Sequence, residues 1–349
     1  MVFKGENMCN FLIISRVTAL VILGALYALV SPVYANTQSP INPVLESVPS
    51  DSINRNNNDN NSNDNFSNNV VVEPNTPELL LQLHKKSIEQ NIAHHPLGQI
   101  MKWVALQLLN QPYVNGLLDL HQPEYVYISL TNTDCMLFIE EVLVASMLIK
   151  ANKLTLPNFI TYIKRVRYHG NEEKPTYCTR NHYFKDWALD NIQKKMVVDI
   201  ALPLTKIVYP YKAEIISNNL KRSPHSPHYV DLKCIVERER YINTNYTSGS
   251  DGYTHKLGFI PLKLLPKYLN KIQDGDIIGI VRASLGSTKV MNSDAIHHLG
   301  IALVGDNGEV GMINASSLST KRKVIITTNL MSYLARFSDS QGIILLRAK

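Results

Sequence analysis

The feature that most constrains the fold is an unbroken apolar run, Met136 to Lys150 (MLFIEEVLVASMLIK), which directly follows Asp134-Cys135. Glu140 and Glu141 are the only charged residues before its last position. A run of this length that is apolar nearly all round predicts a helix buried at the centre of a domain, not one lying on its surface. The rest of the chain must therefore supply elements that cover this helix on all sides.

Cys135 would occupy the first turn of this helix, with Asp134 or Thr133 as the N-cap. Unpaired backbone N–H groups and the positive end of the helix dipole favour a thiolate there. Cys135 is therefore a candidate nucleophile, and the alternative is a small buried hydrophobic residue. The dipole contributes only ~0.3–1 kcal/mol, whereas lowering a thiol pKa from about 8.5 to about 7 requires roughly 2 kcal/mol. A nucleophilic cysteine here therefore also needs a histidine partner.

The first 75 residues are not expected to belong to the folded domain. Residues 1–35 have the pattern of a secretory signal peptide, with an apolar stretch from Val17 to Val30 and a cleavage-like sequence ending at Ala35; an uncleaved anchor is the alternative. Residues 36–75 form an Asn-rich tract with almost nothing to bury, which predicts a disordered linker. Residues 76–349 then form one domain. The protein is expected to be periplasmic or secreted, with no stable membrane span after signal cleavage.

Charge and cysteine content narrow the function classes. The net charge of +6 is mild and spread along the chain, and aromatic residues are not interleaved with basic ones, which argues against nucleic-acid binding. No set of side chains has zinc-ligand spacing, so no metal or other cofactor is expected. Export implies an oxidising compartment for the three cysteines left after cleavage. A Cys178–Cys234 disulfide with Cys135 free fits a nucleophile, and three reduced thiols are the alternative; the sequence does not define the oligomeric state.

Helices are expected to come first in the domain and strands second, which favours an α+β fold. Besides the central helix, helices are predicted at 76–90 with Thr76 as the N-cap, at 99–110 and at 157–166. Strands are predicted at 276–281, 298–304, 310–315, 323–327 and 342–346. The segment from Arg167 to Asn191 is dense in aromatic, basic and amide residues and would be costly to bury without partners. We expect it to line a cleft or cap a sheet edge.

His298 is the best candidate for the base, because it opens a predicted strand and Gly300 leaves that face open to a close neighbour. The Asp-Asn-Gly sequence at 306–308 suits a three-residue hairpin with glycine in the left-handed conformation. In that register Gly300 pairs with Asn314, and His298 lies diagonal to Asn314 on the same face. Cys135, His298 and Asn314 then form a papain-like triad in outline. A different turn would direct Asn314 to the other face.

Two alternatives compete with this assignment. Cys178, with His182 four residues on, is a rival catalytic pair, although Cys178 lacks a clear helix start. His297 and His298 are adjacent, but neighbouring strand residues point to opposite faces, so the two do not readily chelate one metal ion.

These motifs resemble those of the NlpC-type papain-like cysteine cell-wall peptidases, which carry Asp-Cys at a helix start, His-Val-Gly on a strand and His-Ala-Ser on the next. This chain has TDCMLFIEE, HLGIAL and INASS, and LLNQPYVNG resembles that group's Pro-Tyr-x-x-Gly motif. The closer likeness is to the N-acetylmuramoyl-L-alanine amidase-like branch, through VRYHG, YCTRNHYFKDWALDN and GDIIGIV. The resemblance covers most of residues 76–349. It implies a papain-like (NlpC-type) α+β fold, with N-terminal helices and a buried nucleophile helix packed on an antiparallel sheet.

The resemblance implies a secreted peptidoglycan hydrolase in which Cys135 is the nucleophile, His298 the base and Asn314 the orienting residue. Its substrate is expected to be peptidoglycan or a muropeptide, cleaved at the amide between N-acetylmuramic acid and L-alanine. The alternatives are the γ-D-glutamyl–diaminopimelate bond within the stem peptide and a non-catalytic cell-wall binding protein.

The resemblance also implies roles outside the triad. It places the Tyr113 hydroxyl at the oxyanion site beside the Cys135 backbone N–H, and Asp134 either at the substrate's amine or at the helix cap. Further residues match the branch's signature, and they either bind the sugar or stem peptide or brace the fold: Arg180, His182, Tyr183, Asp186 and Trp187.

The sequence departs from the group's pattern at two points. The third triad position is often histidine, and here it is Asn314, which can still orient an imidazole. The spacing from Asp294 to His298 is one residue longer than usual, which makes His297 a competing base. The Leu-Gly that follows His298 matches the motif and favours His298.

Overall fold

The computed structural model describes residues 70–119, 124–170, 175–209, 256–283 and 296–349. The expected signal peptide and most of the expected linker lie outside these ranges. The described structure nevertheless begins inside the tract that was predicted to be disordered. Strand β1 (Val70–Val72) pairs in parallel with β2 (Val126–Ile128), and the Tyr127 hydroxyl donates to Glu73 at 2.7 Å. Three consecutive β-branched valines explain why this end of the polar tract joins the fold.

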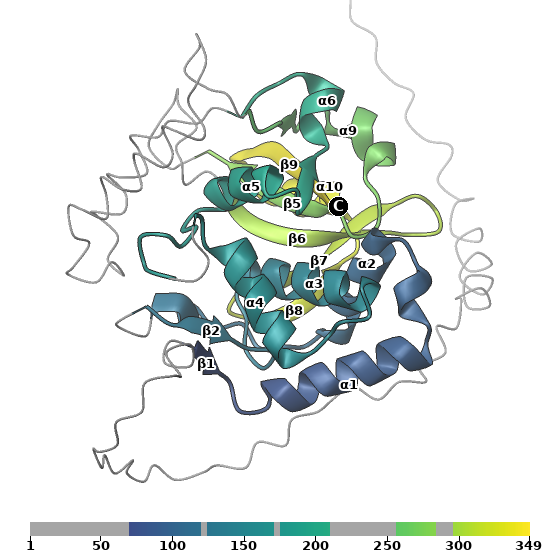
Figure 1. Cartoon of the computed structure of the whole chain (residues 1–349). Coiled ribbons are helices and arrows are strands. Elements are labelled where there is room, and N and C mark those ends of the chain that lie inside the picture. The colour runs from purple at the N-terminus through teal and green to yellow at the C-terminus, as the bar shows by residue number, and fades with distance from the viewer. Residues whose placement is uncertain (1–69, 120–123, 171–174, 210–255, 284–295) are drawn as a thin grey trace, which may run out of the picture. The chain divides into compact units, whose positions relative to one another are not determined.

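Helices form the first half of the described chain, and most strands follow (Figure 1). The helices are α1 (Thr76–Glu89), α2 (Leu97–Gln107), α3 (Cys135–Lys150), α4 (Leu156–Arg167), α5 (Phe184–Gln193), α6 (Ala201–Thr205), α9 (Leu265–Tyr268) and α10 (Leu330–Leu334). Short 3₁₀ turns lie at η1 (Ile92–His94), η2 (Leu117–Asp119) and η3 (Leu269–Lys271). The predicted helices at 99–110 and 157–166 correspond to α2 and α4, within three residues at each end.

The main sheet is antiparallel and has seven strands in the described part of the chain, ordered β3-β9-β5-β6-β7-β8 with β4 also on β9. The strands are β3 (Val197–Asp199), β4 (Ile260–Pro261), β5 (Ile277–Arg282), β6 (Ile296–Val304), β7 (Val310–Ser316), β8 (Lys323–Thr327) and β9 (Ser340–Ala348). All five predicted strands are present. The α+β class with an antiparallel sheet is therefore confirmed.

Helix α3 is the buried central helix that its apolar run predicts. Its buried residues cover every face, and it contacts α2, α4, β6 and β7. Its two internal carboxyl groups are buried with partners: Glu140 pairs with Arg167 at 2.8 Å, and Glu141 accepts from Gln111 at 3.2 Å. Burying such charges without partners would be very costly. These interactions therefore allow a helix with glutamates in its middle to occupy the core.

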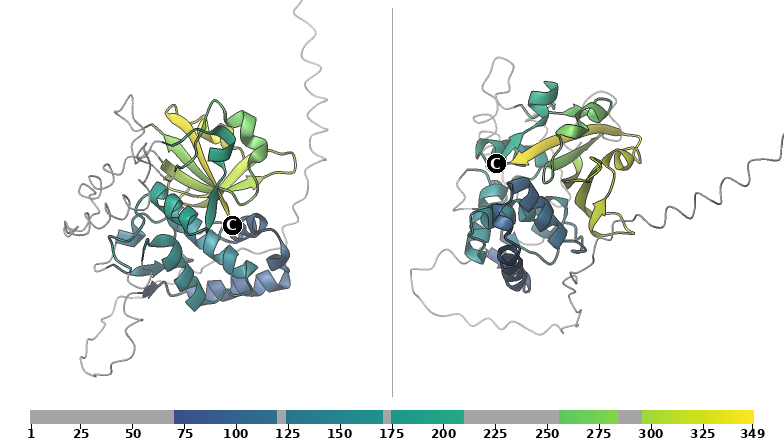
Figure 2. Two further views of the ribbon diagram at one scale, coloured as in Figure 1. Left: turned by 45° about the horizontal axis from the view of Figure 1, so that its top comes forward. Right: turned by 90° about the vertical axis from the view of Figure 1, so that its right-hand side faces the viewer.

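The sheet has a hydrophobic cluster on each face, and alternation along β6 assigns side chains to the two clusters. Leu299 and Ile301 face the large cluster that contains α2, α3 and α4. Ala302 faces the second cluster, which is closed by α9 and α10. Figure 2 shows the helical layer on one side of the green and yellow strands. The sheet is thus buried on both sides, and an accessible site must lie at the end of a strand.

The β6–β7 hairpin has the predicted turn. Gly305 N–H donates to Glu309 O at 2.9 Å, and Gly308 has a φ of 78°, which glycine adopts without strain. The ladder runs from Val304–Val310 to Ile301–Ile313. The register is the one that the turn chemistry predicted, and continued by one step it would place Asn314 opposite Gly300, but the ladder ends before that pair.

Two local predictions were wrong. Thr76 is not the cap of α1, because the helix is preceded by Asn75 and the Thr76 hydroxyl accepts from Leu130 N–H at 3.0 Å. The segment from Arg167 to Asn191 was expected to line a cleft or cap a sheet edge, yet its described residues include most of α5, which is buried along most of its length. Its polar groups are buried because they find partners, as when Lys194 pairs with Asp190 at 2.8 Å.

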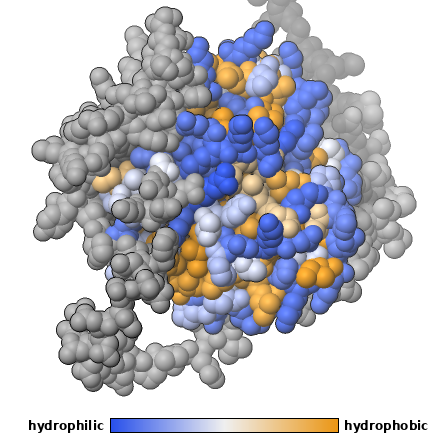
Figure 3. All heavy atoms as spheres, viewed as in Figure 1, coloured by the Kyte–Doolittle hydropathy of each residue, from blue (hydrophilic) through white to orange (hydrophobic). Residues whose placement is uncertain are grey.

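The surface seen in Figure 3 mixes hydrophilic and hydrophobic residues. Two of the exposed large hydrophobic side chains of the described residues come from α1, and the others come from separate places in the chain: Leu81, Ile88, Val198, Val208, Leu318 and Ile326. Within the described ranges, no helix combines the length and apolar character needed to cross a membrane.

Candidate active site

Cys135 is the first residue of α3, as its sequence context predicts, and it is a free cysteine. Asp134 is the N-cap: one carboxylate oxygen accepts from the N–H groups of Met136 and Leu137, both at 2.8 Å. The cap therefore satisfies two of the backbone donors that every helix start leaves unpaired. Cys135 itself is partly exposed at this end of an otherwise buried helix.

The strands diverge where Cys135 meets the sheet. β6 begins at Ile296 and β7 extends to Ser316, but their ladder covers only the pairs from Ile301–Ile313 to Val304–Val310. Before Ile301, β6 is thus paired only with β5. The Leu299 N–H lies near enough to the Cys135 thiol to lower the thiol pKa, without a hydrogen bond of standard geometry. The opening between the two strands is therefore where the nucleophile helix reaches the sheet.

His298 and Asn314 face each other across this opening. His298 Nε2 and Asn314 Oδ1 are 2.9 Å apart, and Asn314 Nδ2 donates to the Thr327 hydroxyl at 2.9 Å. In this orientation of the amide, its oxygen faces the imidazole. An oxygen acceptor at Nε2 requires a proton on that nitrogen, which leaves Nδ1 as the basic atom of the neutral ring.

The structure also shows where the alternative candidates for nucleophile and base lie. Cys178 is disulfide-bonded, so the pair of Cys178 and His182 has no thiol in this state, and the His182 ring interacts with the Tyr177 carbonyl at 2.6 Å. Cys234, the expected partner of Cys178, lies outside the described residues. His297 is exposed, next to the half-buried His298, and in the described structure it is His298 that meets Asn314.

Burial keeps the nucleophile and the base uncharged. It raises the pKa of the Cys135 thiol to about 12, helped by the Asp134 carboxylate and opposed by three backbone N–H groups. Burial lowers the pKa of His298 from 6.5, opposed by the hydrogen bond to Asn314. The position of Cys135 at a helix start suggested a thiolate, but here desolvation and the cap carboxylate outweigh the dipole. The resting pair is a thiol and a neutral imidazole.

Tyr113 lies on the other side of the nucleophile. It forms an isolated bridge with Thr133, and burial, then the negative charges of Cys135 and Asp134, raise the pKa of its hydroxyl. That hydroxyl donates to Asn115 at 3.0 Å, and the Arg322 guanidinium lies 5.9 Å from the ring centre. The structure therefore places Tyr113 near Cys135, and the Tyr113 hydroxyl proton is donated to Asn115.

The remaining signature residues lie in or beside the helical layer. Arg180 is buried, pairs with Glu124 at 3.3 Å and donates to Leu118 O at 3.1 Å. Trp187 is fully buried; its indole lowers the pKa of Glu140 without a hydrogen bond of standard geometry. The other three are the half-buried His182 and Tyr183 and the buried Asp186.

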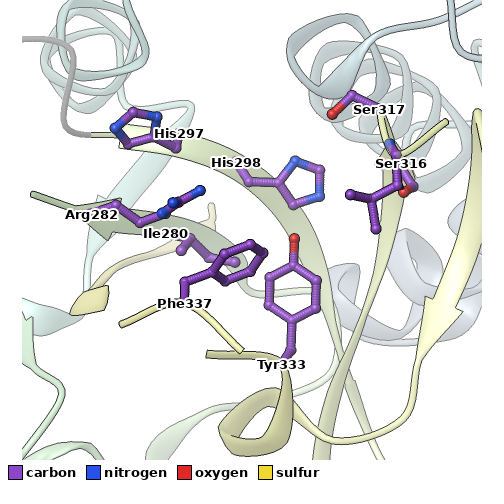
Figure 4. A pocket seen from close by; sticks show the side chains of 9 residues that line it. Ile280, Arg282, His297, His298, Ser316, Ser317, Tyr333 and Phe337 are labelled. Carbon is purple, nitrogen blue, oxygen red and sulfur yellow. The ribbon is translucent and has the colours of Figure 1, made fainter. Parts of the chain in front are cut away.

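A cavity of about 110 Å³ opens beside His298 (Figure 4). Its walls come from β5, β6, the end of β7 and α10 with the residues after it: Ile280, Arg282, His297, His298, Ser316, Ser317, Leu318, Tyr333 and Phe337. Tyr333 stacks on His298, with ring centres 6.1 Å apart and planes inclined by 24°. No three His, Cys, Asp or Glu side chains of the described residues form a group that could hold a metal ion.

Sequence reasoning missed several members of this site. Thr327 could have been found by extending the β7–β8 register, because it lies diagonal to Asn314. Tyr333 and Arg282 carry no local signal, since α10 is a five-residue helix and Arg282 ends a strand. The Leu299 N–H became available only because two strands diverge, which no residue pattern reveals.

Solved structures share this fold. The chain is similar to solved structures of an N-acetylmuramoyl-L-alanine amidase from Bacteroides uniformis, at 22% identity over 72% of this chain and 99% of that chain, with a TM-score of 0.58. It is also similar to a Legionella pneumophila protein, at 20% identity over 78% and 94% of the two chains and a TM-score of 0.54. A Bacteroides fragilis structure with a provisional xylanase name matches at 22% identity over 70% and 98%, with a TM-score of 0.54. At these identities the likeness shows a shared fold.

The family follows from the sequence. The model of the AmiA-like family, described as N-acetylmuramoyl-L-alanine amidase-like, matches residues 103–343. This chain belongs to that family. A search of curated proteins found no match.

Proposed function

We propose that this chain hydrolyses the amide bond between N-acetylmuramic acid and L-alanine, with Cys135 as nucleophile, His298 as base and Asn314 as the orienting residue. Family membership supports a hydrolase that acts on peptidoglycan. The single observation that supports the cysteine chemistry is the 2.9 Å contact between His298 and Asn314, next to Leu299, whose N–H acts on the free Cys135 thiol at the helix start. We assign the arrangement to the papain-like (NlpC-type) group for the same reason.

Acylation begins from the neutral pair. The Cys135 sulfur attacks the carbonyl carbon of the muramic lactyl group while His298 Nδ1 takes the thiol proton. The carbonyl electrons move to oxygen, and the Asn314 amide oxygen stabilises the imidazolium through Nε2–H. The intermediate collapses as the C–N bond breaks, and His298 returns the proton to the leaving L-alanine nitrogen. A thioester on Cys135 and a free stem peptide remain.

Deacylation repeats these steps with water. His298 takes a proton from the attacking water, the second tetrahedral intermediate expels the sulfur, and the proton returns to the thiol. The muramic carboxylic acid leaves and the enzyme is restored. The reaction consumes one water and needs no cofactor.

The oxyanion of both intermediates needs a donor beside the sulfur. The Cys135 N–H lies at the start of α3, and Asp134 caps the next two N–H groups instead. We assign the oxyanion contact to the Cys135 N–H, with the Tyr113 hydroxyl joining it once it leaves Asn115. In this assignment Asp134 is the N-cap of α3, and its negative charge raises the pKa of the Cys135 thiol.

We also propose that residues 1–35 direct export, that the tract from residue 36 up to β1 tethers the domain, and that the enzyme acts in the periplasm or outside the cell. The pattern of the N-terminal sequence supports this assignment. An enzyme that attacks the cell wall must reach it on that side of the membrane.

Three alternatives have less support. Glycoside hydrolysis uses a pair of carboxylates flanking the bond, and the residues that line the cavity include no carboxylate. A non-catalytic cell-wall binding protein would have no use for a free thiol beside a histidine that an amide orients. Cleavage of the γ-D-glutamyl–diaminopimelate bond would use the same triad and would require only a different position of the stem peptide in the site.

The masses of the products distinguish the two bonds. Purified muropeptides are incubated with the enzyme, and the products are identified by mass spectrometry. We expect intact stem peptide that begins with L-alanine, together with the free muramic sugar acid. Release of a muramoyl dipeptide would assign the enzyme to the γ-D-glutamyl bond instead.

A further inference from the structure

The cavity beside His298 is lined by hydrogen-bond donors (Figure 4). One wall carries the Arg282 guanidinium, another the Tyr333 ring and hydroxyl, and a third Ser316 and Ser317. The lining residues include one guanidinium, which forms an ion pair with Asp339 outside the lining, and no carboxylate. A pocket of this composition favours an anion over a neutral group.

Arg282 is held in place from two sides. Its Nε donates to Asp339 at 2.8 Å, and its guanidinium carbon lies 4.3 Å from the centre of the Phe337 ring. Among the described residues, no acceptor bonds to its two terminal nitrogens. The guanidinium is thus oriented through one edge while its terminal N–H groups stay available, which is the geometry that binds a carboxylate in bidentate fashion.

Two hydroxyl groups can complete the binding of an anion. The Tyr333 hydroxyl points toward His298 in Figure 4 and has no hydrogen-bond partner among the described residues, whereas the Tyr113 hydroxyl is engaged by Asn115. Ser316 is buried, and its oxygen accepts from Leu318 N–H at 3.4 Å, so its proton can be donated into the cavity.

We propose that this cavity is a subsite for the α-carboxylate of the isoglutamyl residue in the stem peptide, bound by Arg282 with Tyr333 and Ser316. The inference rests on the proposed function. His298 itself lines the cavity, so the bound group must lie a few bonds from the scissile amide. Beyond L-alanine, whose carboxyl group is in a peptide bond, this α-carboxylate is the first free anion. A stem in which it is a carboxamide would lose the charge.

The test compares two muropeptides that differ only at this carboxyl group, one as carboxylate and one as carboxamide. We expect wild type to hydrolyse the carboxylate stem with a kcat/KM about tenfold to a hundredfold higher, as a charge-assisted hydrogen bond predicts. Arg282→Gln is expected to remove this preference by slowing only the carboxylate stem. Arg282→Lys, which keeps the pair with Asp339, is expected to retain part of it. Arg165→Gln, an equal loss of charge on α4, is the control and is expected to change neither rate.

Equal hydrolysis of both stems by wild type, or an equal slowing of both by Arg282→Gln, would overturn the subsite. A second measurement separates its failure from that of the proposed function. Affinities of the two muropeptides for the Cys135→Ala protein are measured by calorimetry, without any hydrolysis. Tighter binding of the carboxylate form, lost in Cys135→Ala/Arg282→Gln, supports the subsite whichever bond is cut. Equal affinities contradict it.

Discussion

Two polar clusters involve α3, one at its first residue and one around Glu140, and they differ in how their polar groups find partners. The first is the catalytic edge, Cys135, His298 and Asn314, which opens on a cavity. The second is an ionic layer in the helical half, where Glu140 and Arg167 pair at 2.8 Å with side chains only 2% exposed. The charges of the ionic layer are paired inside the protein. The groups of the catalytic edge are neutral, and none of the described residues forms a hydrogen bond with Nδ1 of His298. The comparison shows that a buried polar residue stabilises the fold when its hydrogen bonds are satisfied inside the protein. It can take part in a reaction when one of its atoms remains available to a substrate.

The largest expected effect at the catalytic edge comes from His298→Ala. Loss of the base should lower kcat/KM by about 10⁴-fold, with little loss of stability, because the imidazole is desolvated in the folded state. Steady-state kinetics and urea unfolding measure the two effects on the same protein. If stability fell sharply while activity survived, the catalytic edge would be structural and the comparison would fail.

Arg167→Met should have the opposite profile. It leaves Glu140 buried without its partner, which costs about 3–5 kcal/mol of stability. The double variant Glu140→Gln/Arg167→Met should recover much of this loss, because neither charge then remains. The free energies of unfolding of the two single variants and the double variant form the cycle, and simple additivity of the two single losses would show that the pair is not coupled.

The third prediction concerns Asn314→Ala and the pH dependence of the reaction. It should lower kcat roughly 10²-fold, the lower end of what positioned acid–base groups contribute. The base must be neutral, and the pKa of His298 is lowered by burial, so the acid limb of kcat/KM for wild type should lie below 6.5. The hydrogen bond to Asn314 raises that pKa, so its loss should move the limb to still lower pH. A limb that stays in place in a slow variant would assign Asn314 a purely structural role.

The smallest effects concern the resting thiol. Because burial raises the pKa of Cys135 to about 12, labelling by iodoacetamide should be slow at pH 7 and rise about tenfold per pH unit. Asp134→Asn keeps a good N-cap and removes a charge that raises this pKa, so it should label faster with a stability change within about 0.5 kcal/mol. Labelling of wild type that reaches a plateau near pH 7 would show a thiolate instead.

Much of this site could be predicted because local patterns define it. The apolar run gives α3, the Asp-Cys junction gives its start, and the turn at 306–308 fixes the register that brings Asn314 toward His298. The rest depends on tertiary packing. The charge state of Cys135 follows from burial, which overrides the helix dipole, and the burial of α5 depends on partners distant in sequence. Likewise Arg282 and Tyr333 reach the cavity from strand and helix ends that carry no motif.

The most direct test of the central claim compares wild type with Cys135→Ala on one muropeptide. Both proteins are checked for native structure by circular dichroism, and release of stem peptide is followed by mass spectrometry with and without a metal chelator. We predict that wild type releases the stem peptide whether or not the chelator is present, and that Cys135→Ala releases none above background. Hydrolysis by Cys135→Ala near the wild-type rate would contradict cysteine catalysis at this site.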